Sequence, residues 1–132
     1  MIDLTVPTWL TEKVALWIDR LQLGEWEIGL RLALVLNDDA NVQGLCDQYP
    51  DLNEARLTFR ADIEDTKEWE RTIVHELLHV KHSRIDHFLE GVVFPGLDGV
   101  TATMTYRQFV ESYTHSLAKA LVDSHGEYSD IE

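Results

Sequence analysis

The chain has 132 residues, 45% of them hydrophobic, and its 24 acidic and 11 basic residues give a net charge of −13. This length predicts a single domain over residues 1–132, with enough apolar side chains to bury a core without disulfides. The acidic balance argues against nucleic acids and anionic membrane surfaces as partners, because binding either needs a basic surface. It is compatible with a cationic peptide or protein substrate, and it leaves the oligomeric state open.

The only cysteine, Cys46, excludes an internal disulfide framework and favours a reducing compartment. No N-terminal stretch has the charged-then-apolar build of a signal peptide, and charged residues interrupt the first apolar segment, residues 10–23. Nothing approaches an uninterrupted transmembrane length. We therefore expect a cytoplasmic protein.

The first half of the chain predicts one helix and two firm strands. Residues 8–23 carry apolar side chains at the 3.6-residue period of a helix, and a glycine follows as a stop. Residues 26–36 alternate large apolar side chains with other residues, which indicates a strand, and so do residues 54–61. Between them, residues 42–50 predict a short strand or a loop.

The second half predicts two helices separated by a loop. One helix follows a cap at Asp65 or Thr66 and runs to about Arg84, apolar over so much of its circumference that it must lie inside the fold. Residues 85–103, with several glycines and a proline, predict a long connection, and residues 105–124 open with a capping-box spacing and predict the last helix. The fold class is therefore α+β: an N-terminal helix, a small and mostly antiparallel sheet, a central helix and a C-terminal helix.

The central helix contains the segment His75-Glu76-Leu77-Leu78-His79, which is an H-E-x-x-H pattern. Positions i and i+4 lie on the same face of a helix, so the two imidazoles can bind one zinc ion. Glu76 can reach a water held on that ion and act as its general base. The alternative is a buried helix that carries two histidines and no metal.

A catalytic zinc ion usually takes three protein ligands and leaves one position for water. The favoured third ligand is Glu111, because it stands among apolar and aromatic residues of the last helix, where an unpaired carboxylate is costly to bury. His115 shares its helix face and is a candidate to orient a ligand. The alternative for Glu111 is a position in solvent beside Arg107 or Gln108.

Other ligand candidates are weaker. His82 shares the motif face but lies about 10 Å from His75 along the helix axis, which favours a supporting or surface role. Cys46 would be a ligand in a deformylase-like site, but its neighbours Gly44-Leu45-Cys46-Asp47 do not match that pattern closely. The remaining candidates lie in or near the predicted loop: Asp86, His87 and Glu90.

The segments Thr72–His79 and Val110–Tyr113 resemble the gluzincin group of zinc metallopeptidases. The short chain resembles the minimal members, small HExxH proteins of bacteria and their phages. The resemblance implies a zincin-like domain that hydrolyses peptide bonds in a cleft between the strands and the lower helix. The strand nearest that cleft, taken as residues 54–61, would pair with an extended substrate. Larger members use a Tyr or His to stabilise the oxyanion, and the candidates here are His87, Tyr106, Tyr113 and His115.

The sequence therefore predicts a zinc metallopeptidase with His75, His79 and Glu111 as ligands and Glu76 as the catalytic base. The alternative is a non-catalytic zinc-binding or interaction module on a metallopeptidase scaffold. The presence of Glu76 favours catalysis, because a structural zinc site needs no acid at that position. A third reading is a latent enzyme, covered by the loop at 85–103 or by the acidic tail at 127–132.

Overall fold

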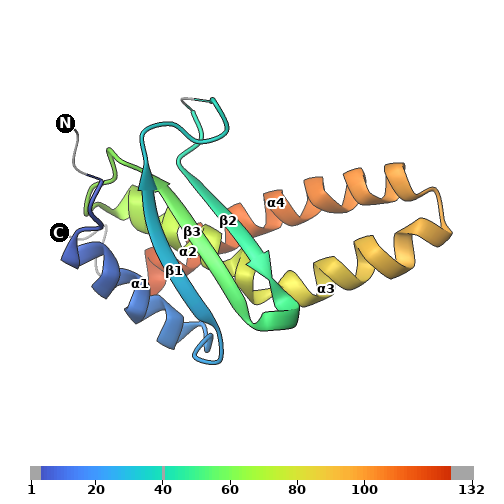
Figure 1. Ribbon diagram of the computed structural model, residues 1–132, viewed down its shortest axis with the longest axis horizontal. Helices are drawn as coiled ribbons and strands as arrows, with labels where there is room; N and C mark the ends of the chain where they lie inside the picture. The colour runs from blue at the N-terminus through green and yellow to red at the C-terminus, as the bar shows by residue number, and fades with distance from the viewer. Residues whose placement is uncertain (1–3, 40, 126–132) are drawn as a thin grey trace.

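The computed structural model describes residues 4–39 and 41–125, and these form an α+β fold (Figure 1). The acidic tail lies outside the described residues. In chain order the helices and strands are α1 (Thr8–Arg20), β1 (Glu27–Ala33), β2 (Gly44–Tyr49), β3 (Glu54–Arg60), α2 (Lys67–Lys81), α3 (Ser83–Phe88) and α4 (Gly99–His125). Both firm strands and the weaker prediction at 42–50 correspond to strands, each within a few residues of the expected bounds.

The sheet is mixed, with the order β1-β3-β2. β1 is parallel to β3, with Glu27 opposite Glu54, whereas β2 is antiparallel to β3, with Gly44 opposite Phe59. The expectation of a mostly antiparallel sheet is therefore wrong for the β1–β3 pair. The chain reverses after β1 and again through the turn at Pro50–Asn53, so β1 and β3 run the same way, and β3 then inserts between its two predecessors.

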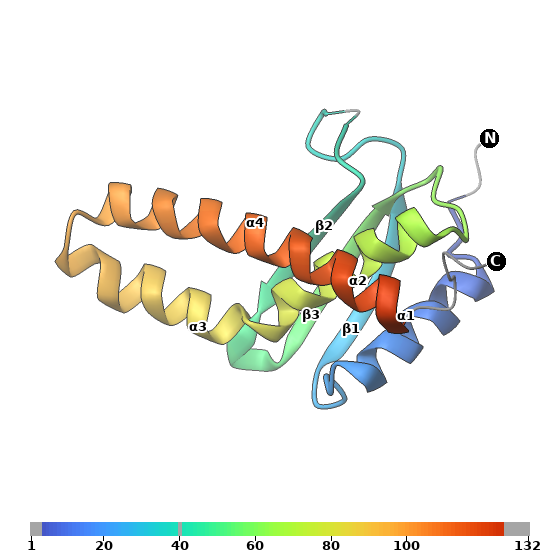
Figure 2. The same ribbon diagram turned by 180° about the vertical axis from the view of Figure 1, so that it is seen from behind.

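The helices stack on one face of the sheet. α2 lies between the sheet and α4, and α1 lies beside α2, as the two opposite views show (Figures 1 and 2). Fully buried side chains from all these elements meet along α2: Trp17, Leu57, Phe59, Ile73, Leu77 and Val122. The predicted interior position of the central helix is confirmed, because its apolar residues are shared between the sheet on one side and α4 on the other.

The bounds of α2 follow from its caps. The Oγ1 atom of Thr66 accepts a hydrogen bond from the Trp69 backbone N–H at 3.3 Å, which satisfies one of the free donors of the first turn. Thr66, rather than Asp65, is therefore the N-cap. The helix ends at Lys81, before the expected Arg84, and His82 joins it to α3.

The segment 85–103 is not the loop that its glycines and proline predicted. It continues through α3, a π-helical turn at Leu89–Val93 and a 3-10 turn at Phe94–Gly96, and α4 begins at Gly99 rather than 105. α3 and α4 form a helical hairpin whose tip projects away from the sheet (Figure 1). The glycines and the proline do not break the helices over a long stretch, since the reversal needs only a few residues and Gly91 is tolerated within a helical turn. This geometry does not favour the segment as a cover for the motif.

A buried ion pair joins α1 to α2. Lys13 Nζ lies 3.8 Å from Glu70 Oε2, and the same carboxylate oxygen accepts a hydrogen bond from the Trp17 indole N–H at 2.8 Å. The lysine and the glutamate are 4% and 1% exposed. Each buried charge is stabilised by its partner, because water cannot reach either group to solvate it.

We expect Lys13→Met to lower the free energy of unfolding by about 3–5 kcal/mol, since it leaves the Glu70 carboxylate buried without its counter-charge. Urea denaturation followed by circular dichroism measures the change. The matched control is Lys119→Met, at an exposed lysine with no hydrogen bond or ion pair to another described residue, for which we expect a change within about 0.5 kcal/mol. Equal stability of the Lys13→Met variant and the wild type would contradict the prediction.

Candidate metal centre

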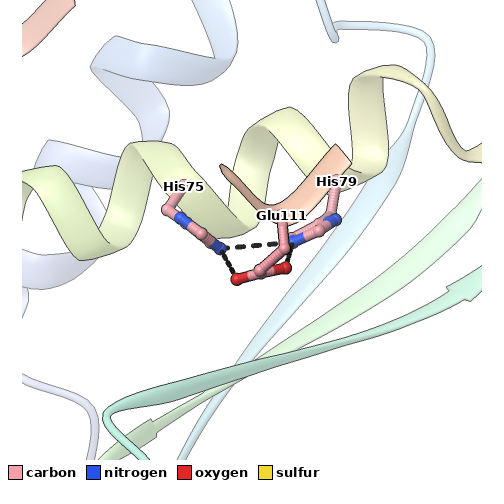
Figure 3. Close-up of side chains that lie close together, drawn as sticks. All are labelled: His75, His79 and Glu111. Carbon is pink, nitrogen blue, oxygen red and sulfur yellow. Dashed lines mark hydrogen bonds and ion pairs between the residues drawn. The ribbon is translucent and has the colours of Figure 1, made fainter. Parts of the chain in front are cut away.

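Three side chains from two helices meet at one point. His75 and His79 lie one turn apart on α2, and Glu111 reaches them from α4 (Figure 3). The Nε2 atoms of the two histidines are 3.2 Å apart. Glu111 Oε1 lies 2.7 Å from the Nε2 atom of His75, and its Oε2 lies 3.1 Å from that of His79. The sequence placed these residues on two helices, and the packing of α4 on α2 brings them together.

This donor set fits a divalent metal. Two imidazole nitrogens and one carboxylate oxygen, each about 2.1 Å from a tetrahedral zinc ion, would lie about 3.4 Å from one another. The two imidazole nitrogens are already 3.2 Å apart, and each lies against a different oxygen of the Glu111 carboxylate, at 2.7 and 3.1 Å. A small opening of the cluster would admit an ion between the three side chains. The set is typical of a catalytic rather than a structural zinc site, because three protein ligands leave one position open. Other divalent transition metals accept the same ligands.

The electrostatics of the cluster favour a cation. Hydrogen bonds from His75 and His79 hold the pKa of the Glu111 carboxyl well below its usual range, despite partial desolvation. Burial by itself would lower the pKa of His79, but its hydrogen bond to Glu111 and the charge of Glu76 raise it overall. The neighbouring carboxylates therefore favour the protonated form of the His79 imidazole. A metal ion competes with that proton, so its affinity falls as the pH falls.

Glu76 lies beside the cluster and is almost fully buried, at 7% exposed. It lines the same cleft as His75 and Glu111. Burial raises the pKa of its carboxyl, and the neighbouring imidazoles oppose that rise. A carboxylate held in this position, next to the donors but not among them, is placed to exchange a proton with a molecule bound at the cluster.

Gly44, at the start of β2, leaves space for the Glu76 side chain, a role that was not identified from the sequence. A Cβ atom at this glycine would lie 3.2 Å from Glu76 Cγ and 3.2 Å from Cδ1 of Phe59. Glycine in a strand often marks a close approach of another group to the backbone, and that signal was available.

We expect Gly44→Ala to lower any turnover that depends on Glu76 by about tenfold, since small misplacements of reacting groups are costly. Zinc content should stay the same, because no ligand moves directly. The matched control is Gly29→Ala in β1, where a Cβ atom meets nothing within 4 Å. Steady-state rates of the two variants, with zinc measured in each, check the prediction; equal rates would contradict it.

A cleft of about 520 Å³ opens beside the cluster. Its walls are α2 and α4, and its rim is formed by residues 41–44 that lead into β2. The expectation that residues 54–61 lie nearest the cleft is wrong. β3 is the central strand and is hydrogen-bonded on both sides, whereas β2 is an edge strand and reaches the cleft through Gly44.

Two of the candidate supporting residues lie next to the cluster, on opposite sides. His115 lines the large cleft, and its ring centroid is 6.1 Å from that of His75. Tyr106 lines a smaller hollow of about 250 Å³ together with His79 and Glu111. Its hydroxyl donates a hydrogen bond to Asp86 Oδ1 at 2.5 Å, so it is already engaged.

The other two candidates are not brought to the cluster. Tyr113 is largely exposed and stacks on Phe109, with ring centroids 6.1 Å apart. His87 lies in a separate hollow beside Pro50. Spacing along the chain placed Tyr113 close to Glu111, but two residues later on a helix is a different face.

The weaker ligand candidates also take other roles. His82 Nδ1 lies 3.7 Å from Asp86 Oδ2, and Glu90 pairs with Arg107. The latter pair means that Arg107 does not hold Glu111 in solvent. Burial, followed by the charge of Glu76, raises the pKa of the Cys46 thiol to about 12. A thiol kept protonated is a poor metal ligand, and within the described ranges Cys46 does not join the cluster.

No protein-family model, curated protein or solved structure was found to match this chain. Within residues 4–39 and 41–125, no helix is both long and apolar enough to cross a membrane. The function therefore has to be inferred from the geometry of the cluster and its cleft.

Proposed function

We propose that this protein is a zinc-dependent metallopeptidase of the zincin type, with His75, His79 and Glu111 as ligands and Glu76 as general base. The observation that carries the proposal is the convergence of three donor atoms from α2 and α4, all within 4.8 Å of one another. The adjoining carboxylate of Glu76 adds the one group that a structural metal site does not need.

Each residue has a role in this proposal. Zinc, when bound, supplies a Lewis acid and an activated water. The Glu76 carboxylate would accept a proton from the attacking water and return it to the leaving amine. His115, on the cleft side of the cluster, would donate a hydrogen bond to the carbonyl oxygen of the substrate. Gly44 leaves room for the Glu76 carboxylate to reach both the water and the leaving amine.

The cleft favours an extended peptide as the substrate. Its volume of about 520 Å³ is in the range of ordinary ligand sites. Among the residues that the structure describes, β2 pairs only with β3, so its outer edge has backbone donors and acceptors that an added strand can satisfy. A peptide in this position would pass Gly44 and bring its carbonyl towards the cluster.

One observation favours the second candidate function, a non-catalytic interaction module. The tip of the α3–α4 hairpin exposes several large apolar side chains, which are typical of a protein-binding surface: Val92, Leu97, Val100 and Met104. A module of this kind needs the hairpin and not Glu76. Replacing Glu76 should therefore abolish peptide hydrolysis but leave partner binding by such a module unchanged.

The first experiment is elemental analysis of protein purified without added metal, followed by digestion of a quenched fluorescent peptide library. We expect one zinc ion per chain and hydrolysis that a chelator abolishes and added zinc restores. Zinc binding without hydrolysis of any peptide would favour the interaction module. Failure to bind zinc even after reconstitution would contradict the metallopeptidase and leave the interaction module, which rests on the exposed hairpin rather than on the metal.

A further inference from the structure

The cleft continues past the metal centre to a cationic end. Beyond His75 it follows the N-terminal half of α2 and the C-terminal half of α4, where its charged lining residues are Glu68, Arg71 and Lys119. This end of the cleft therefore has two basic residues and one acidic residue, whereas the whole chain has 24 acidic and 11 basic residues. The local charge of this end therefore differs in sign from the charge of the protein.

Lys119 is placed to act on a bound molecule. It lies two helical turns after Glu111 and one after His115, so all three side chains share the face of α4 that lines the cleft. Within the described part of the chain, the Lys119 ammonium has no hydrogen bond or ion pair to another residue. An ammonium group in a cleft without a protein partner can pair with a ligand without breaking an existing contact.

Arg71 is held in place and supports the same end. Its Nε atom donates a hydrogen bond to Asp123 Oδ1 at 3.1 Å, and the Nζ of Lys67 lies 3.4 Å from the same oxygen. One carboxylate therefore contacts two cations, and it holds the Arg71 guanidinium at this end of the cleft. On the cleft rim, the Thr72 hydroxyl donates to the Gln43 side-chain oxygen at 2.9 Å and holds residues 41–44 against α2.

We propose that this end of the cleft binds a carboxylate of the substrate, with Lys119 as the residue that determines the preference. The proposal rests on the proposed function in that the bound molecule is taken to be a peptide. The carboxylate is either an acidic side chain or the C-terminus of the peptide. The net charge of −13 is compatible with a cationic substrate, but a ligand within the cleft meets the nearby charges first, since salt screens the more distant ones.

Binding tests the proposal separately from catalysis. The probes are fluorescein-labelled peptides that differ only in having Glu, Gln or Lys at one position, scanned along the peptide, each with a free or an amidated C-terminus. Their affinity is measured by anisotropy on the zinc-loaded Glu76→Gln protein, which cannot consume them. We expect one carboxylate to strengthen binding by about fivefold at physiological salt, where the more distant acidic residues are screened, as for a favourable exposed ion pair. Preference for Glu over Gln identifies a side chain, and preference for the free C-terminus identifies that group.

The same measurement in Lys119 variants assigns the preference. We expect Lys119→Gln to abolish it and Lys119→Glu to reverse it in favour of the Lys peptide. Lys81→Gln, at the other end of α2, makes the same change in net charge and should keep the preference. Equal affinity for all peptides, including no measurable binding of any, or a preference retained in Lys119→Gln, would overturn the inference. A Lys119-dependent preference without cleavage by the wild type would support it and contradict only the proposed catalysis.

Discussion

The Glu76→Gln variant is expected to bind zinc as tightly as the wild type and to lose about 10²–10⁴-fold in kcat, the usual contribution of a positioned general base. Glutamine has nearly the same shape as glutamate, so the contact with Gly44 and the geometry of the ligands should be kept. Only the ability to accept a proton is removed. Because Glu76 is buried, a solvent water cannot easily take its place as the base. We therefore expect the loss in kcat to lie at the large end of the range.

The comparison that makes this result informative is His79→Ala, which removes a ligand and should abolish zinc binding and hydrolysis together. Both variants are compared by elemental analysis, by hydrolysis of the best library peptide, and by circular dichroism to confirm folding. Equal activity of Glu76→Gln and the wild type would refute the mechanism even if the protein binds zinc. Loss of zinc in Glu76→Gln would show that this carboxylate is itself a ligand.

Removing the third ligand should have the second large effect. We expect Glu111→Ala to weaken zinc binding by more than the roughly 10–100-fold that loss of a residue supporting a ligand typically causes. In the wild type, zinc at about 1,000 times its dissociation constant should stabilise the fold by about 4 kcal/mol. The variant should lose most of that stabilisation, because only two ligands remain, the imidazoles of His75 and His79 on one helix. Thermal unfolding with and without zinc measures the difference.

A matched control for Glu111→Ala is Glu90→Ala. Glu90 is also a glutamate beside the hollow next to His79, but it pairs with Arg107 rather than with the histidines. We expect its zinc affinity to stay within a few-fold of the wild type. If Glu111→Ala kept full affinity, the third ligand would have to be another residue near the two histidines, and His115 would be the first to replace.

The residues of the candidate site could be read from the sequence to the extent that their arrangement is local. The spacing of His75 and His79 is a property of one helix, and so is the position of Glu76 next to them. The expected burial of the Glu111 carboxylate is wrong, because this side chain is 61% exposed in the structure. What places Glu111 at the cluster is the crossing of α4 over α2.

The error at 85–103 has a local cause of a different kind. Glycine and proline are strong signals in isolation, but each needs only one or two residues of special backbone, and the apolar residues around them extend both helices. The resulting hairpin moves the start of α4 to Gly99 and leaves Thr105 and Gln108 inside the helix. The capping-box spacing at these two residues was coincidental, because side chains of this type also occur within helices.

By itself the sequence determined the helical period of α1 and α2, the alternation of β1 and β3, and the H-E-x-x-H pattern, because each depends on residues a few positions apart. The tertiary structure decided which strand is central, that β2 is the edge strand at the cleft, and that Gly44 faces Glu76. It also brought Lys119 and Arg71 to one end of the cleft. These features depend on contacts between residues far apart in the chain, which form only when whole elements pack together, and no local pattern encodes them.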